Sequence, residues 1–194
     1  MARPYEFDRA EALETAMDVF WAKGYEATSL QDLIDAMGLS KSSFYNAFES
    51  KHHLFTETLR HYNECMTTPL ATTLMDSPSG LAFVKSVFEE IIDQSKTSAG
   101  MKGCFLMNTA TEFAQSDSEI GDIMSSGLKK IETVFHHAIL KAQASGEVPQ
   151  RKDASALAKF LVSNMSGLKT MVKAGIKPAQ LRPIVNTLID SLVS

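Results

Sequence analysis

The fold of this chain is decided by residues 28–51, TSLQDLIDAMGLSKSSFYNAFESK. Thr28 and Gln31 have the spacing of a helix capping box, in which two side chains satisfy free backbone N–H groups at a helix start. Apolar residues then recur at i, i+3, i+4 and i+7, which predicts a short helix with one buried side. Gly38 follows this run and is expected to end the helix, because glycine adopts a positive φ without steric cost.

A second short helix is expected immediately after this glycine. Ser40 can cap its start, and Phe44 and Phe48, four residues apart, give it a buried side. Its other side is left to hydrogen-bonding side chains: Lys41, Ser42, Ser43, Tyr45 and Asn46. Ser50 then starts the next helix, with Lys51 in its first turn. The helix dipole disfavours a cation at that position unless an anion such as phosphate is near. Helix, glycine turn and helix is the helix-turn-helix pattern, whose second helix enters the major groove of DNA.

The same stretch closely resembles the DNA-binding domain of TetR/AcrR-type transcriptional regulators. The residues that carry the resemblance are Gly24-Tyr25, Thr28-Ser29-Leu30, Ile34, Met37 to Lys41, Phe44-Tyr45, Phe48 and Lys51 to Phe55. It covers residues 7–60, and the remainder of the chain resembles these regulators in architecture only. One position departs from the family, because Ala47 stands where its Tyr-x-His-Phe motif has histidine. Whether Asn46 replaces the phosphate contact of that histidine stays open.

The resemblance implies a DNA-binding domain over residues 1–50 and an effector-binding and dimerisation domain over residues 51–194. It places Thr28, Tyr45 and Lys51 on the phosphate backbone and residues 41–43 near base edges. The full set of expected DNA-contacting residues is Thr28, Ser40, Lys41, Ser42, Ser43, Tyr45, Asn46 and Lys51. The alternative is that these side chains form only a solvated surface. A basic tail at Arg3 could either reach DNA or fray.

The composition is that of a globular protein without a membrane span. The 194 residues are 44% hydrophobic and 22% charged, and no apolar run approaches the ~20 residues of a transmembrane helix. The N-terminal residues lack an apolar signal region, so a cytoplasmic protein is expected. The two cysteines, Cys65 and Cys104, have no metal-ligand spacing and suggest no disulfide scaffold. No metal and no cofactor are expected.

The net charge argues against a nucleic-acid partner, whereas the local charge distribution argues for one. The chain carries −4 at pH 7, and residues 1–60 hold six Lys or Arg against ten Asp or Glu. Residues 38–53, however, contain Lys41 and Lys51 against Glu49 alone. We therefore expect double-stranded DNA as a partner, with few phosphate contacts per subunit and a shallow dependence of affinity on salt.

Helical periodicity continues to the end of the chain, and no segment alternates as a strand would. The sequence therefore predicts an all-α fold of about nine helices, the first over residues 8–23. Pro69 is expected to end or kink the fourth helix. The expected helix starts further along are Ser77-Pro78 for the fifth helix and a capping box of Ser116 and Glu119 for the seventh.

The resemblance also implies a pocket for a small-molecule effector among the C-terminal helices. The chain has 10 methionines, which adapt to varied apolar ligands, and 11 phenylalanines. The candidate walls of a pocket for a small apolar effector are Phe83, Phe88, Cys104, Phe105, Met107, Phe113, Met124, Phe135 and Met165. Ordinary core packing is the alternative for each of them. Cys104 has a further alternative as a sensor of electrophiles or oxidants, since a thiol near a helix start ionises more readily.

Two apolar stripes near the C-terminus are expected to pair the chain with a second copy. In the family, the corresponding helices of two subunits form a four-helix bundle. The residues expected at this homodimer interface are Leu161, Met165, Leu168, Val172, Val185, Leu188, Ile189 and Leu192. Burial of both stripes within one subunit is the alternative.

Together these features predict a dimeric, ligand-responsive DNA-binding regulator of a palindromic operator, most often a repressor in this family. Catalysis is not expected. Glu132 and His136 share a helical face, but no second copy completes a metal site, and no glycine-rich phosphate loop is present. Two rival classes stay open: a helical-bundle enzyme, and a protein-interaction adaptor that does not bind DNA.

Overall fold

The computed structural model describes residues 7–98, 100–113 and 116–194, and within these residues the fold is all-α, which confirms the prediction. The described residues form nine α-helices and one short 3-10 helix and contain no strand. The elements are α1 (Arg9–Lys23), α2 (Leu30–Met37), α3 (Lys41–Phe48), α4 (Lys51–Asp76), α5 (Gly80–Gln94), η1 (Gly100–Lys102), α6 (Phe105–Phe113), α7 (Ser118–Ala144), α8 (Ala154–Lys173) and α9 (Pro178–Val193). Arg3 of the basic tail lies outside the described residues.

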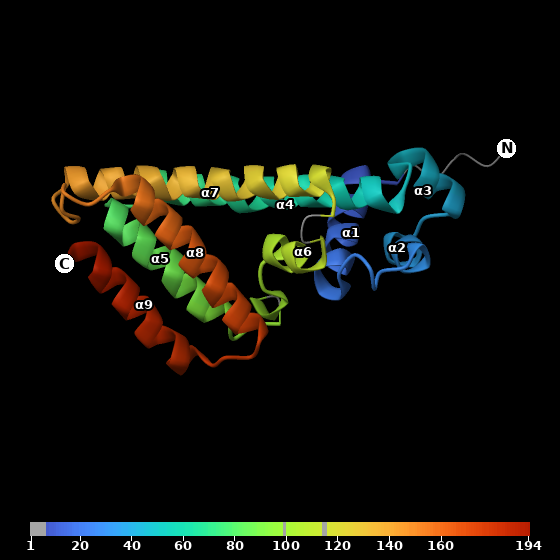
Figure 1. Ribbon diagram of the computed structural model, residues 1–194. Helices are drawn as coiled ribbons and strands as arrows, with labels where there is room; N and C mark the ends of the chain where they lie inside the picture. The colour runs from blue at the N-terminus through green and yellow to red at the C-terminus, as the bar shows by residue number, and fades with distance from the viewer. Residues whose placement is uncertain (1–6, 99, 114–115) are drawn as a thin grey trace.

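The helices form an elongated molecule (Figure 1). α1, α2 and α3 lie at one end, near the N-terminus, and α5, α8 and α9 lie at the other, near the C-terminus. The two longest helices, α4 and α7, pack against each other and extend from one end toward the other. α6 lies between the ends, where Phe105 stacks on Trp21 of α1. α4 and α7 are therefore the elements that both ends share.

Buried apolar side chains form two cores, one at each end. The N-terminal core takes residues from α1 to α4, from α6 and from the start of α7, including Phe20, Leu33, Phe44, Phe48, Phe55, Tyr62, Phe105 and Ile123. The C-terminal core takes residues from α5, α7, α8 and α9, including Phe83, Phe88, Ile92, Phe135, Leu161, Leu168 and Leu188. The N-terminal core extends past residue 50 into α4. The domain boundary at that residue stays a prediction.

Side-chain caps start most of the described helices, and those of α3 and α4 stand where the sequence predicts. Ser40 accepts a hydrogen bond from the backbone N–H of Ser43 at 3.1 Å and starts α3. Ser50 accepts from the backbone N–H of His53 at 3.0 Å and starts α4. These caps fix the beginning of the recognition helix and of the helix after it.

The cap of α2 is Ser29, so the predicted capping box of Thr28 and Gln31 is wrong. Ser29 and Asp32 form the box instead. Thr28 is fully buried, and its hydroxyl donates to the carbonyl of Gly24 at 2.5 Å. Because that hydroxyl is already bonded, the next residue is the one free to cap the helix.

The caps of α5 and α7 also differ from prediction by one or two residues. Ser79, not Ser77, accepts the backbone N–H of the third residue of α5 at 3.1 Å, and Ser77 ends α4. Asp117, not Ser116, caps α7, accepting from Ile120 at 3.0 Å. A carboxylate is a stronger acceptor at a helix start than a hydroxyl, because the helix dipole favours negative charge there.

Pro69, which is expected to end or kink α4, does not end it, because the helix passes through the proline and ends at Asp76. Pro69 is exposed. The helix is buried on both sides of it, with Tyr62 in the N-terminal core and Leu70 and Leu74 against the C-terminal core. Packing at both ends outweighs the one backbone hydrogen bond that a proline removes.

The contact between α4 and α7 includes a buried polar group. Asn63 donates to the carbonyl of Ile123 at 3.0 Å, and its Oδ1 has no hydrogen-bond partner among the described residues. Gly127 lies directly against this amide, since a Cβ there would be 2.1 Å from Asn63 Oδ1. Only glycine permits this close approach of α7 to α4.

Candidate nucleic-acid interface

α3 turns an apolar side inward and a polar side outward. Phe44 and Phe48 are fully buried, with ring centroids 5.9 Å apart, and hold α3 in the N-terminal core. Gly38, with a φ of 65°, makes the turn between α2 and α3. The exposed residues of α3 are Lys41, Ser42, Tyr45 and Asn46. A short helix held from behind with a free polar side can enter the major groove.

Seven of the eight predicted DNA-contacting residues lie on α3 or beside its two ends, and Thr28 is the exception. Ser40 is exposed, and Ser43 is half-buried with its hydroxyl oxygen 2.8 Å from that of Ser40. Lys51 is half-buried at the start of α4. Thr28 is buried and bonded to the backbone, so its side chain cannot reach a phosphate in this conformation.

Lys51 has an aromatic partner that the sequence pattern did not indicate. Its Nζ lies 4.1 Å from the ring centroid of Tyr25, which is within the range of a cation–π contact. Tyr25 packs in turn on Phe55, with ring centroids 4.8 Å apart. The contact offsets the unfavourable position of a cation in the first turn of α4 and fixes Lys51 beside α3.

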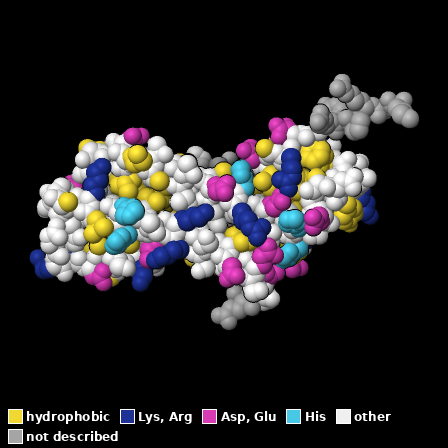
Figure 2. All heavy atoms as spheres, turned by 90° about the horizontal axis from the view of Figure 1, so that it is seen from above, with side chains coloured by type: hydrophobic (Ala, Val, Ile, Leu, Met, Phe, Trp, Pro, Cys, Tyr) yellow, Lys and Arg dark blue, Asp and Glu magenta, His cyan; other side chains and the backbone are white. Residues whose placement is uncertain are grey.

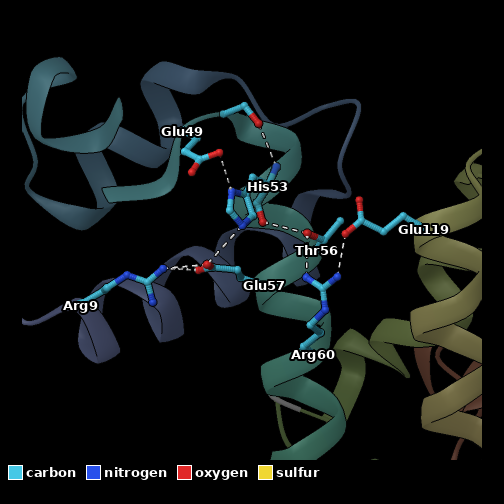
Figure 3. Close-up of polar contacts among 8 residues, drawn as sticks. Arg9, Glu49, His53, Thr56, Glu57, Arg60 and Glu119 are labelled. Carbon is cyan, nitrogen blue, oxygen red and sulfur yellow. Dashed lines mark hydrogen bonds and ion pairs between the residues drawn. The ribbon is translucent and has the colours of Figure 1, made fainter. Parts of the chain in front are cut away.

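A network of polar side chains links the far end of α3 to α4 and α1 (Figure 3). Glu49, which follows α3 with a φ of 60°, has a carboxylate oxygen 3.3 Å from His53 Nδ1. His53 Nε2 lies 3.5 Å from Glu57, which accepts two hydrogen bonds from Arg9 at 2.7 and 2.8 Å. The network links the end of α3 to α4 and α1. The i, i+4 spacing of residues 49, 53 and 57 could have revealed it from sequence, whereas Arg9 could not be paired without the fold.

A second set of polar contacts joins α6 and η1 to α1 and its following loop. The carboxylate of Glu112 accepts the backbone N–H groups of Tyr25 and Glu26 at 2.9 and 3.3 Å. Lys102 forms an ion pair with Asp18 of α1 at 2.8 Å. Sequence reasoning missed these pairs, because their partners are more than eighty residues apart.

An ion pair and a hydrogen bond join α4 to the start of α7. Arg60 contacts Glu119 at 2.7 Å (Figure 3), and His52 Nε2 lies 2.8 Å from Asp117. Hydrogen bonds from the backbone N–H of Ile120 and from His52 hold the pKa of Asp117 below its usual value. Asp117 therefore caps α7 and binds α4 at the same time.

Charge is mixed over the surface. Figure 2 shows Lys and Arg side chains interspersed with Asp and Glu, and they form no continuous basic stripe on that face. Such a surface gives little non-specific attraction to the phosphate backbone. Affinity for DNA would then depend on the few contacts made by α3 and its neighbours.

The predicted effector-pocket residues are divided between the two cores and do not surround one cavity. Phe83, Phe88 and Phe135 are fully buried in the C-terminal core. Cys104 and Phe105 are buried in the N-terminal core, and Met107, Phe113 and Met124 pack partly buried against it. Large apolar side chains fill the interior by interdigitating, which is the alternative of ordinary core packing. A cavity does lie among the helices, and of the nine predicted residues only Met165 lines its described part.

The cavity lies where α1, α4, α5 and α8 meet. It comprises two adjoining pockets that share lining residues, a larger lobe of about 200 Å³ and a smaller lobe of about 60 Å³. Met66, Ile91, Gln94 and Lys169 line both lobes. Trp21 of α1 lines the larger lobe. The cavity therefore touches the DNA-binding end as well as the C-terminal helices.

The predicted dimer stripes of α8 and α9 face inward. Ile189 packs partly buried against the C-terminal core. The other seven residues are buried in that core: Leu161, Met165, Leu168, Val172, Val185, Leu188 and Leu192. Their 3.6-residue period marks the side that packs on α5 and α7. The outer side of the same helices bears an open groove lined by Phe160, Asn164, Pro183, Ile184, Thr187, Leu188 and Ser191, so Leu188 of the predicted interface also borders this groove.

The two cysteines have different surroundings. Cys104 is buried, and the hydroxyl of Tyr62 lies 3.8 Å from its sulfur. Cys65 is exposed, with its sulfur 3.5 Å from His61 Nε2. In the part of the chain that the structure describes, no three His, Cys, Asp or Glu side chains are grouped as a metal would need, and no helix is long and apolar enough to cross a membrane.

A helix-turn-helix with a free polar side, carried on an all-helical body, defines a DNA-binding transcriptional regulator. Residues 12–58 match the family described as bacterial regulatory proteins, tetR family, and residues 80–188 match the tetracyclin repressor-like C-terminal domain. The chain belongs to the TetR family, whose members are transcriptional regulators and not enzymes.

Relatives and solved structures agree with this assignment. The uncharacterized HTH-type transcriptional regulator YezE of Bacillus subtilis is 30% identical over 99% of this chain and 100% of its own length. The HTH-type transcriptional repressor ComR of Escherichia coli is 30% identical over 96% of this chain and 90% of its own. A cysteine mutant of the TetR family regulator CifR, complexed with 26-bp double-strand operator DNA, superposes with a TM-score of 0.87 at 28% identity, covering 98% of this chain and 100% of that one.

Proposed function

We propose that the chain is a homodimeric repressor that binds a palindromic operator and is released by a small apolar effector. The observation that carries the proposal is the exposed polar side of α3, held from behind by Phe44 and Phe48. CifR, which has the same fold, has been solved on operator DNA, and ComR is a repressor. A DNA-binding regulator acts where its operator lies, which keeps the cytoplasm as the proposed location.

The exposed residues of α3 have two roles in this proposal. Lys41 and Ser42, in the first turn, approach base edges in the major groove, because the N-terminal residues of a recognition helix make the base contacts. Tyr45, Asn46 and Lys51 contact phosphates and set the register of the helix on the duplex. Ser40 and Ser43 chiefly maintain the cap of α3.

The proposed dimer uses the outer sides of α8 and α9. Since the inner stripes fill the subunit core, the second copy must pack on the side that carries Phe160 and Ile184. Phe160 is 40% exposed, an unusual exposure for a phenylalanine in a single subunit. A two-fold axis there predicts operator half-sites with centres ~34–36 Å apart or a multiple of it.

Release requires that an effector favour a conformation in which the two copies of α3 no longer match that spacing. The cavity reaches Trp21 of α1, so an occupant could bias the position of α1 relative to α5 and α8. A coupling of about 1–3 kcal/mol, or about 5–150-fold in operator affinity, is typical of such regulation.

An electrophoretic mobility shift with the DNA upstream of the chain's own gene tests the proposal. We expect a dimer-sized complex with that DNA that survives competition by a scrambled duplex. Ser42→Arg, which replaces an exposed side chain of α3, should abolish this preference, whereas Ser125→Arg, an exposed change on α7, should not. Binding to no duplex would favour the adaptor alternative.

A second candidate function is sensing of electrophiles or oxidants through Cys104. The observation that favours it is the position of the thiol beside the start of α6, with Tyr62 and the charge of Lys169 near it. Cys104→Ser should then remove the response of DNA binding to an oxidant, whereas Cys65→Ser should retain it. A normal response in Cys104→Ser excludes this function.

A further inference from the structure

Among the described residues, the cavity contains one buried donor without an acceptor and one half-buried cation. Trp21 Nε1 is buried and has no partner among the described residues. Lys169 lines both lobes and is half-buried. A buried donor without an acceptor is costly, and a partly desolvated cation favours an anion beside it. The cavity therefore presents positive charge and N–H groups that an occupant could satisfy.

The remaining walls fit an apolar body. Met66, Ile91 and Val172 line the larger lobe, and Leu70 and Val87 line the smaller one. Glu90 is the acidic residue among the lining residues, and its carboxylate accepts from the side-chain amide of Gln94 at 2.9 Å. Glu90 acts on the charge of Lys169 from the wall of the smaller lobe, and its Oε1 is already bonded to Gln94.

Burial also makes Lys169 a favourable partner for an anion. The apolar walls lower the pKa of its ammonium, although the charges of Cys104 and Glu90 act in the opposite direction. A group that loses solvation on burial gains more from an anion placed beside it than an exposed lysine would.

The volume limits the size of the occupant. An engineered protein cavity of about 150 Å³ binds benzene, so lobes of about 200 and 60 Å³ together accept one aromatic ring with a short chain and one polar group.

We infer that this cavity binds a small apolar carboxylate whose anionic group is held by Lys169 and Trp21. The inference rests on the proposed function, because it names the chemical class of the effector. The carboxylate bridges α8 to α1, and its body packs on α4 and α5. An occupied cavity thus sets the position of α1, and with it α3, relative to the C-terminal helices.

Isothermal titration calorimetry on the full chain tests the inference with three probes of one shape: 4-phenylbutanoate, 4-phenylbutan-1-ol and 4-phenylbutylamine. We expect the carboxylate to bind about 10- to 100-fold more tightly than the alcohol, as expected of a charge-assisted hydrogen bond, and the amine to bind worst. Trp21 is the sole tryptophan of the chain, so its fluorescence reports occupancy directly. Equal binding of acid and alcohol, preference for the amine, or no binding of any probe overturns the inference.

Two lysine variants separate the site from general charge. Lys169→Met keeps most of the length of the side chain without its charge and should reduce the affinity for the carboxylate to that for the alcohol. Lys159→Met removes an exposed charge from the same helix and should leave the preference intact. Trp21→Phe keeps an aromatic ring without the N–H and should weaken carboxylate binding about tenfold. A carboxylate preference retained in Lys169→Met overturns the inference.

DNA binding is measured separately, so failure of the carboxylate site can be distinguished from failure of the proposed function. If the operator is bound but no probe binds, the regulator stands and the carboxylate site is overturned. If 4-phenylbutanoate binds through Lys169 but no DNA is bound, the site stands and the proposed function fails. Reduced operator binding in the presence of 4-phenylbutanoate, absent in Lys169→Met, supports both.

Discussion

The two cores of this molecule differ in what fills them. The N-terminal core is rich in aromatic rings. The ring centroid of Phe55, for example, lies 4.8–5.8 Å from those of four other rings: Phe20, Tyr25, Phe105 and Phe113. The C-terminal core is mainly aliphatic, apart from Phe83, Phe88 and Phe135. Aromatic side chains bury large areas with defined geometry, so a few of them can fix three short helices. A small DNA-reading unit gains order in this way from few residues.

The region between the cores is packed less completely than either core. It contains the cavity with Trp21 and Lys169 and the buried amide of Asn63 against Gly127. The contacts from α6 and η1 to α1 include exposed charges, which individually contribute little stability. Each end therefore has its own packed core, whereas the cavity lies in the region between them that α4 and α7 cross as continuous helices. A ligand that prefers one arrangement of this region shifts the equilibrium by its difference in affinity between the arrangements.

The largest expected effect comes from truncating one ring in each core. Phe55→Ala and Phe135→Ala should each lower the free energy of unfolding by about 3–5 kcal/mol, because both leave a cavity at a fully buried site. If the cores are separate units, Phe55→Ala should lower the urea midpoint seen by Trp21 fluorescence more than the midpoint seen by circular dichroism. Phe135→Ala should do the reverse. Coincident midpoints in both variants would show one cooperative unit and break the comparison.

The next effect tests whether the face of α3 divides into positioning and reading residues. Lys51→Ala should weaken binding about fivefold to tenfold on all sequences alike and reduce the salt dependence, because it removes a phosphate contact. Changing Ser42, which is exposed, should alter which base pair is preferred, a change of about 1–3 kcal/mol between sequences. Binding to a library of operator variants measures both. Uniform loss in both variants would refute the division.

Short-range patterns predicted the N-terminal end well for a physical reason. The turn at Gly38, the caps at Ser40 and Ser50 and the buried pair Phe44 and Phe48 depend on residues within one or two helical turns of each other. The errors there were small shifts of caps, as at Thr28, whose burial could not be known before the loop to Gly24 was folded.

The walls of the cavity were not predictable in the same way. Periodicity marks which side of a helix is buried, but not whether that side meets another helix or an empty space. Leu161 and Phe88 carry the same signal as Met165, and only Met165 lines the cavity. Lys169 gave no signal, because a lysine on a helix is normally solvated and its neighbours come from α1 and α5.

A smaller effect is expected at the contact between α6 and the loop after α1. Glu112→Ala removes the acceptor of the Tyr25 and Glu26 backbone N–H groups and should cost at most about 1.5 kcal/mol of stability, since the site is exposed. Its effect on the effector-dependent release of DNA, expressed as a free energy, should be larger than its effect on the free energy of unfolding. Glu132→Ala is the matched control, because its partner Lys129 lies in the same helix. If both variants release DNA equally well, α6 does not transmit the signal.

The smallest effect concerns the pH dependence of the N-terminal end. Hydrogen bonds from Lys23 and from Ser29 hold the pKa of Asp32 below its usual value of 3.8. Because the folded-state pKa is the lower one, the ionised carboxylate stabilises the fold above the unfolded-state pKa. This contribution begins to decrease below about pH 4 and is lost only as the pH falls through the folded-state pKa. Asp32→Asn should therefore be slightly less stable than the parent at pH 7, and the difference should be smaller at pH 3. Thermal unfolding at the two pH values, followed by Trp21 fluorescence, measures the difference, and an undiminished difference at pH 3 would show that the charge of Asp32 does not contribute.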